Sequence, residues 1–268
     1  MMKQSNKKIK AFGFSRKAMS YPYMLFMLVF IVVPLVLILI NAFVADGQLT
    51  FDNFVSFFKD VTKLNTLATS LVVGFITTMI CLLVGYPVAL ILSKFHAGNK
   101  ILVLLFIMPM WVNFLIRTLA TKAIFTALGI DLRSMGTAIF GMVYNYLPFM
   151  ILPLHTALTS IDNSYSEAAQ DLGCDKMQVF AKVTLPLSLP GVLSGVTMVF
   201  IPSISTFAIT EILTENNIFL FGDDIAKMFA ADMYGVGSVM SLVMLVFVVL
   251  LNIVMNKFGS EEARRSAL

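Results

Sequence analysis

The sequence predicts an all-α membrane protein with six transmembrane helices and both termini in the cytoplasm. Composition, the length of the apolar runs and the distribution of basic residues all indicate this class. Of the 268 residues, 59% are hydrophobic and 13% are charged, and the mean hydropathy is +0.90. A soluble domain has about 25% charged residues. Too little polar surface remains to cover a globule in water, so the excess apolar surface is expected to face lipid.

Six apolar runs have the length of about 20 residues that a helix needs to cross a bilayer. These runs are Tyr23–Phe43, Ser70–Leu92, Ile101–Ala120, Met135–Leu158, Leu187–Thr210 and Val236–Met255. The third is interrupted by Arg117. The fifth carries seven Ser and Thr residues, so it either lines a water-accessible path or packs closely through its small residues. Residues 1–22 are expected to form a basic N-terminal segment, residues 23–256 the transmembrane domain and residues 257–268 a tail.

The basic residues set the expected orientation. Thirteen Lys and Arg residues would lie on the side of the two termini and six on the other side. Because basic residues are enriched in cytoplasmic segments, both termini are placed in the cytoplasm. The outside loop Val44–Thr69 is amphipathic and is expected to hold a helix at the membrane surface. The outside loop Glu211–Gly235 has a net charge of −4, which would attract a cationic solute unless the loop is merely solvated.

The cytoplasmic loop 159–186 contains the strongest local signals in the chain. Ser164 and Glu167 have the spacing of a capping box, so a helix is expected to begin there and to end at Gly173. Its apolar face would consist of Tyr165, Ala168, Ala169 and Leu172. A second short helix would begin at Asp175 and end at Leu185-Pro186. Such a loop either only connects two spans or docks a cytoplasmic partner, which two alanines beside an exposed carboxylate would favour.

This loop resembles the EAA loop of ABC importer permeases. The shared pattern is Glu167-Ala168-Ala169, three residues, Gly173, nine residues and Val183-Thr184-Leu185-Pro186, with Val183 in place of isoleucine. The resemblance implies a MetI-like permease core with a cytoplasmic coupling helix that sits in a groove of an ATPase. The positions expected to serve this coupling are Ser164, Glu167, Ala168, Ala169, Asp171, Gly173, Leu185 and Pro186.

Shorter motifs resemble the spermidine/putrescine importer permeases, and the first of their two permease subunits in particular. They are Gly85-Tyr86-Pro87, Pro109 to Asn113 with Leu115-Ile116-Arg117, Tyr144, and Leu147 to Met150. The resemblance implies a multi-pass protein of a bacterial cell membrane that takes up polyamines as a heterodimer with a second permease subunit. A cytoplasmic ATPase dimer and an extracytoplasmic polyamine-binding protein would complete the importer.

Four residues are expected along the substrate path. Trp111 and Tyr144 would offer aromatic faces to ammonium groups, although Trp111 is equally suited to anchor the chain at the interface. Asn113 would hydrogen-bond a passing amine, and Glu211 would supply a negative charge at the outer end of the fifth span. Arg117 does not suit a path for cations, so it would pair with an outside carboxylate or keep the path shut.

The chain is not expected to be an enzyme. It contains no Gly-Lys dipeptide and therefore no P-loop, and it lacks H-E-x-x-H and G-x-S-x-G motifs. No metal, cofactor or nucleic acid is expected to bind this chain; the partner ATPase would hold ATP and Mg, and lipid would surround the spans. The alternatives are an importer permease for another small solute or an ion-coupled secondary transporter. The absence of ionisable residues at the centres of the spans disfavours the second alternative.

Overall fold

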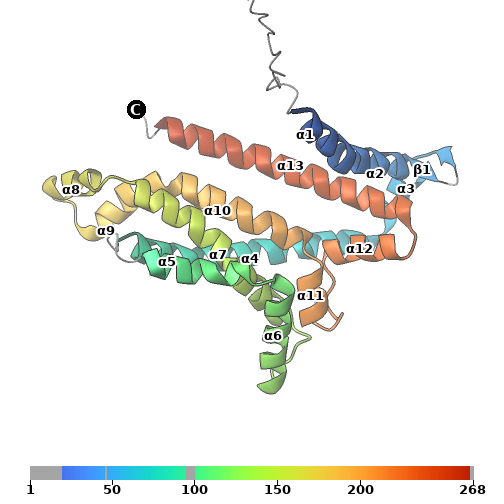
Figure 1. Cartoon of the computed structure of the whole chain (residues 1–268), viewed down its shortest axis with the longest axis horizontal. Coiled ribbons are helices and arrows are strands. Elements are labelled where there is room, and N and C mark those ends of the chain that lie inside the picture. Colours follow the sequence, from blue (N-terminus) through green and yellow to red (C-terminus); the bar gives the residue numbers. More distant parts are fainter. Residues whose placement is uncertain (1–19, 46, 95–99, 266–268) are drawn as a thin grey trace, which may run out of the picture.

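The structure, a computed structural model, describes residues 20–45, 47–94 and 100–265 and is almost entirely helical (Figure 1). In this part of the chain, five helical stretches are long and apolar enough to cross a membrane. They are Ser20–Phe43, Val61–Lys94, Met135–Ser160, Lys176–Ser205 and Tyr234–Met255. A bent pair, Leu104–Trp111 and Phe114–Ala127, makes a sixth if it counts as one span. The all-α class and the number of spans are thereby confirmed, while residues 1–19 and 266–268 of the basic segment and the tail lie outside the described residues.

The core of the bundle consists of α4 (Val61–Lys94), α7 (Met135–Ser160) and α10 (Leu185–Ser205). Glycines allow α10 to lie close to α7, because a Cβ added at Gly191 would meet the Cβ of Ala157 at 2.4 Å. The hydroxyl groups of Tyr86 and Ser188 join α4 to α10 at 2.8 Å. Close packing through small residues, one of the two interpretations of the polar fifth span, is therefore confirmed.

The first span lies at the edge of this core beside the last one. It consists of α1 (Ser20–Met27), a π-helical turn (Leu28–Val32) and α2 (Val33–Phe43), and α2 packs on α13 (Tyr234–Arg265). A short hairpin follows, in which β1 (Val44–Ala45) pairs antiparallel with β2 (Gln48–Leu49). The predicted surface helix is α3 (Asp52–Lys59), whose amphipathic face is packed against the bundle because Phe57 is fully buried against Phe221.

The predicted second and fifth spans have different ends in the structure. The second begins at Val61 instead of Ser70. The fifth extends from α9 (Lys176–Val179) through a π-helical turn (Phe180–Thr184) into α10, so Leu185-Pro186 does not end the preceding helix. Pro186 lacks an N–H group, and the wider turn adapts to it because the N–H group of Leu185 donates to the carbonyl group of Phe180, five residues back. The helix then ends at Ser205 rather than at Thr210.

The predicted third span, Ile101–Ala120, is wrong as a single helix. The chain forms α5 (Lys100–Ile107), a 3₁₀ turn (Met108–Trp111) and α6 (Phe114–Ala127), with a bend of 97°. Pro109 removes a backbone donor from the helix ladder, and the side chain of Asn113 begins a new helix by accepting the N–H group of Leu115 at 2.8 Å. We call this break the elbow, residues 108–117.

The remaining helices lie at the two ends of the bundle. Figure 1 shows α8 (Asn163–Asp171) and α9 at one end, beside the far end of α13, and this is called the α8 end below. The opposite end carries α3, the hairpin and α12 (Phe221–Ala230). α6 projects sideways from the bundle next to α11 (Ala208–Leu213), against which it packs.

Candidate functional site

The helix predicted around the Glu-Ala-Ala sequence is α8. It begins at Asn163, slightly earlier than expected, and a different residue caps it. The side chain of Asp162 caps it by accepting the N–H group of Ser164 at 2.9 Å. The predicted capping box of Ser164 and Glu167 is wrong, because Asp162 stands two residues earlier and already satisfies a free donor of the first turn. Its hydrogen bonds with Ser164 hold the pKa of Asp162 below its usual value.

The end of α8 was predicted correctly at Gly173. The N–H group of Cys174 donates to the carbonyl group of Ala169 at 3.0 Å, and that of Gly173 to the carbonyl group of Gln170 at 2.8 Å. This pair of bonds is a Schellman motif, which requires a left-handed residue, and Gly173 has φ of +87°. Asp175 then opens α9 with a complete capping box to Gln178, as expected. Both ends of α8 are thus fixed by the local sequence.

The apolar face of α8 is not packed against its own chain. Tyr165 is 58% exposed and Leu172 is 87% exposed, and Met177 of α9 is 76% exposed. Ala168 and Glu167 are exposed beside them, as is Asp171. Large apolar side chains grouped at a rigid, capped turn are typical of a surface that another protein covers. Apart from its capping residue the helix is as predicted, and this surface is what a docking partner would contact.

The elbow carries two of the four predicted path residues, and a third, Tyr144, contacts Arg117 of the elbow. Trp111 is 81% exposed on the 3₁₀ turn, and Asn113 is exposed at the start of α6. The ring of Tyr144, from α7, is reached by Arg117 of α6, whose guanidinium carbon lies 5.8 Å from the ring centre. The aromatic face expected for a substrate amine is therefore occupied by a cation of the chain itself.

Arg117 is buried to 7% exposure, and its Nε and Nη1 atoms have no hydrogen-bond partner. Among the residues that the structure describes, no carboxylate forms an ion pair with it. The interpretation in which Arg117 pairs with an outside carboxylate of this chain is therefore wrong for these residues. The neighbouring Asn145 also has an unpartnered buried oxygen, while its amide group donates to Thr118 of α6 at 3.3 Å.

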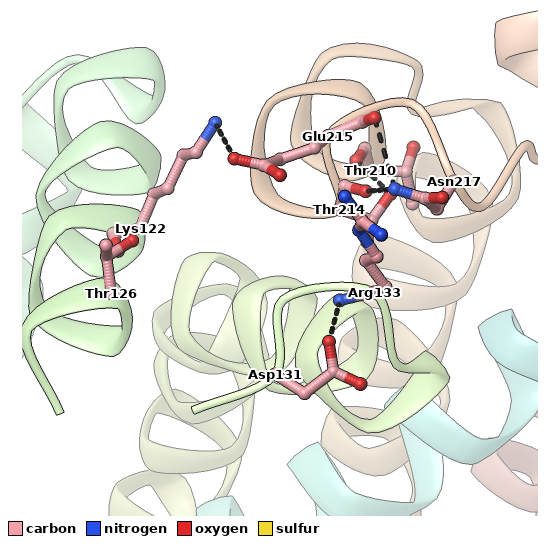
Figure 2. A network of polar contacts seen from close by, with 8 residues as sticks. All are labelled: Lys122, Thr126, Asp131, Arg133, Thr210, Thr214, Glu215 and Asn217. Carbon is pink, nitrogen blue, oxygen red and sulfur yellow. Dashed lines mark hydrogen bonds and ion pairs between the residues drawn. The ribbon is translucent and has the colours of Figure 1, made fainter. Parts of the chain in front are cut away.

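A second polar network joins α6 to the turn after α11. Figure 2 shows Lys122 of α6 directed at Glu215, and their charged atoms are 3.2 Å apart. In the same view the amide group of Asn217 donates to the carbonyl group of Thr214, and the backbone N–H group of Arg133 donates to Asp131. The ion pair therefore neutralises the charge of Lys122, one of the six basic residues expected on the outside.

Glu211 does not join the elbow residues. It is exposed on α11 instead of ending the fifth span, and it lines a cavity of about 150 Å³ with Asn216, Phe219 and Lys227. The ammonium group of Lys227 already lies over the ring of Phe219, 2.9 Å from its centre. Asp223 also lines this cavity. Of the acids in this loop, Glu215 is neutralised by its ion pair with Lys122.

Asp223 was expected in a solvated loop and is instead buried. One of its carboxylate oxygens accepts the hydroxyl group of Thr210 at 2.8 Å and the N–H group of Leu220 at 2.7 Å, and the other has no partner. Burial raises the pKa of Asp223 to about 6, and the nearby charge of Glu211 adds to the rise. The sequence signal was its place at the third residue of α12, where an acid caps the helix.

No group of three or more His, Cys, Asp and Glu side chains lies close enough to hold a metal ion within residues 20–45, 47–94 and 100–265. Of the remaining coupling residues, Leu185 and Pro186 begin α10 inside the continuous helix that starts at α9. A rigid exposed helix at one end and a bent span with a buried cation are thus the two features with functional potential.

Residues 82–259 match the family described as binding-protein-dependent transport system inner membrane component. A protein of Haemophilus influenzae named spermidine/putrescine transport system permease protein PotB is 34% identical, covering 83% of this chain and 86% of its own length. The protein of that name from Escherichia coli is 30% identical, covering 82% and 92%.

Solved structures share the fold at low sequence identity. A bacterial ABC transporter of alginate, in complex with a pentasaccharide-bound periplasmic protein, contains a chain with a TM-score of 0.72 and 14% identity, which covers 91% of this chain and 93% of its own. The methionine ABC transporter MetNI, in an inward-facing conformation, contains a chain with a TM-score of 0.60 and 17% identity, covering 74% and 95%. The fold of this chain is therefore shared with chains of these ABC transporters.

Proposed function

The chain belongs to the family of binding-protein-dependent transport system inner membrane components, and from this premise we propose that it is a permease subunit for polyamine uptake. As a member of that family it is a multi-pass membrane protein and a component of a transporter. The proposed substrates are spermidine and putrescine, because two relatives at 34% and 30% identity carry that name and align over more than 80% of this chain.

The proposed partners are those of an ABC importer. A second permease subunit would complete the pathway as a heterodimer, a cytoplasmic ATPase dimer would bind ATP and Mg, and an extracytoplasmic protein would deliver the polyamine. The observation that carries the ATPase partner is the surface of α8, where Tyr165 and Leu172 are exposed on a helix capped at both ends. We place this α8 end, with both termini, in the cytoplasm, in agreement with the excess of basic residues there.

Energy would enter through α8. Closure of the ATPase dimer would displace α8, and the continuous helix from Lys176 to Ser205 would carry the movement into the membrane. Moving a two-state equilibrium from 1:99 to 99:1 requires a differential interaction of about 5.5 kcal/mol. A contact with a single exposed charge would not supply this free energy. A groove that buries Tyr165, Leu172 and Met177 would supply it, because burial of each large side chain contributes roughly 1.5–3 kcal/mol.

The substrate path is proposed to pass the elbow. Trp111 would contact an ammonium group with its exposed ring, and Asn113 would accept a hydrogen bond with its remaining lone pair. At Tyr144 the amine would compete with the guanidinium group of Arg117 for the ring face. Glu211, outside this group, would act earlier by attracting the cation to the outer end.

Uptake by cells tests this function. Radiolabelled spermidine is measured in cells lacking the chain and in cells that regain it, with putrescine, an amino acid and an ionophore added in parallel. Uptake should return with the chain, fall when putrescine competes and persist with the ionophore while ATP lasts. Uptake that never depends on the chain would remove the polyamine assignment, and uptake abolished by the ionophore at normal ATP would indicate an ion-coupled carrier.

A further inference from the structure

A cavity with a volume of about 560 Å³ lies at the α8 end. It is enclosed by the last turns of α4 and α7 and by α8, α9 and the π-helical turn. Among the described residues that line it, the only charged ones are Lys94 and Lys176. These lysines are also terminal residues of two candidate spans, Val61–Lys94 and Lys176–Ser205, so they lie where the apolar part of each helix ends.

The positive charge in this cavity is not neutralised by the chain. Within the part of the chain that the structure describes, neither lysine forms an ion pair, and the acidic residues of α8 and its flanking turns do not line the cavity. Asn163, Ser166 and Gln170 add hydrogen-bond donors to the lining. Two ammonium groups and several neutral donors around one volume suit an anion with several oxygens, such as a phosphate group.

A second hollow lies near the cavity, further from the α8 end along α4 and α10. It is a groove of about 410 Å³ between α4 and α10, lined by Tyr86, Pro87, Pro186 and Leu189 among other residues, with no charged side chain. Phe180 lines the polar cavity and packs edge-on against Tyr86 of the groove, with ring centres 5.8 Å apart. The polar and the apolar hollow therefore meet at this aromatic pair.

The depth of the groove fits one leaflet of a bilayer. Its deepest α4 residues, Leu82 and Leu83, are 12 and 11 positions from Lys94, which is about 17 Å along a helix at 1.5 Å per residue. The hydrocarbon core of a bilayer is about 30 Å thick, so half of it is about 15 Å. The cavity at the boundary and the apolar groove, whose far end lies about 17 Å from Lys94, together span the depth of one leaflet, as a phospholipid does.

We propose that an anionic phospholipid binds at the α8 end, with its phosphate between Lys94 and Lys176 and one acyl chain along the groove between Tyr86 and Leu189. Basic pockets between helices at a cytoplasmic boundary are suited to such headgroups. The lipid would tie the end of α4 to α9 and so hold α8 in place. Binding itself needs only the membrane-spanning fold, whereas the effect on ATPase coupling rests on the proposed function.

Native mass spectrometry tests the binding directly. The full chain, with the subunits that purify with it, is released from mild detergent after incubation with phosphatidylglycerol or phosphatidylcholine. Phosphatidylglycerol should be retained and phosphatidylcholine should not. The variant K94Q/K176Q should retain at least fivefold less phosphatidylglycerol, and K94R/K176R, which keeps both charges, should retain as much as the unmodified chain. The matched control K59Q/K182Q removes two lysines that do not line the cavity and should bind normally.

Two results would overturn the lipid site. One is equal retention of phosphatidylglycerol by K94Q/K176Q and the unmodified chain. The other is competition by millimolar glycerol phosphate that is as effective as competition by the intact lipid, which would assign the cavity to a free phosphate compound. A charged substitution in the groove, Leu189→Glu, should lower retention with both lysines in place. Because no step of this assay measures transport, its failure is distinguishable from failure of polyamine uptake.

Discussion

The guanidinium group of Arg117 lies over the ring of Tyr144, 5.8 Å from its centre, and this contact joins the hydrogen bond from Asn145 to Thr118 in linking α6 to α7. A buried guanidinium group with two unpartnered nitrogens is costly unless another group compensates for its lost hydration. The ring face supplies part of that compensation. A polyamine passing the elbow would present the same chemistry as Arg117, so the two cations would compete for one aromatic face.

This competition predicts the effect of changes at Tyr144. Tyr144→Phe keeps the ring face and should leave the KM for spermidine within about twofold. Tyr144→Leu removes the face, and a lost cation–π contact of about 0.5–2 kcal/mol corresponds to a KM roughly 2- to 30-fold higher. Uptake kinetics in cells with equal amounts of each variant provide the measurement. Equal KM values for the two variants would exclude a substrate contact at this ring.

A change at Glu167 tests the coupling role of α8. Glu167→Lys reverses the charge of an exposed residue between Ala168 and the cap, so transport should fall at least tenfold while the membrane part stays folded. Asp52→Lys is the matched control, since Asp52 is an exposed acid in the first turn of a helix at the opposite end. Uptake and the melting temperature in detergent are compared for both. Normal uptake with Glu167→Lys would show that this carboxylate has no part in coupling.

Asp223 predicts a specific dependence of stability on pH. Its pKa is about 6 in the folded chain and 3.8 in an unfolded one, so the folded state binds the proton more tightly. The free energy of unfolding should therefore fall as the pH rises from about 4 to about 6. Above that range, Asp223 should cause no further change. Asp223→Asn keeps an oxygen for Thr210 and Leu220 and cannot ionise.

The comparison of thermal unfolding at pH 4, 5, 6 and 7 checks this expectation. The Asp223→Asn variant should be as stable as the parent at pH 4 and more stable at pH 7, with a smaller slope between them. Asp224→Asn, a change at the neighbouring residue, should not alter the pH dependence of stability that Asp223 produces. A parent and an Asp223→Asn variant with parallel pH profiles would show that the buried carboxyl group is not ionised within this range.

The close contact between α7 and α10 predicts the effect of adding a single methyl group at Gly191. Gly191→Ala would place its Cβ 2.4 Å from that of Ala157 and 2.9 Å from the carbonyl oxygen of Pro153, so it should destabilise the chain by about 1–3 kcal/mol. Gly136→Ala should not destabilise the chain, because the atom nearest to its added Cβ lies 3.7 Å away. Ala157→Gly added to Gly191→Ala should recover part of the stability in detergent unfolding assays, because it removes the contact with Ala157 and leaves that with Pro153. Failure of this rescue would contradict the packing.

Much of this arrangement could be predicted because local rules determine it. The spans follow from apolar length, and the end of α8 follows from Gly173, since only a left-handed residue completes the Schellman motif. The start of α8 was misplaced because Ser164 and Asp162 are both good caps, and the sequence does not show which one the chain selects. The same limit applies at Leu185-Pro186, where a π-helical turn preserves a helix that proline usually ends.

The candidate path depends on long-range packing, which is why its geometry was not predictable. The position of Tyr144 against Arg117 requires the bend of 97° after Trp111, and apolar composition alone suggests an unbroken span there. Asp223 was assigned to a solvated loop because its burial depends on Thr210 and on the side of α12 that faces the bundle. Charge counts along a chain do not reveal such a neutralised or buried acid.

The most direct test of the account is spermidine accumulation in proteoliposomes that contain this chain and the subunits purified with it. ATP is enclosed in the vesicles, and the polyamine-loaded extracytoplasmic protein is added outside. Spermidine should accumulate only with enclosed ATP, should persist with an ionophore and should stop with Glu167→Lys. Accumulation without ATP, or an equal rate for Glu167→Lys, would contradict an importer permease that receives its energy through α8.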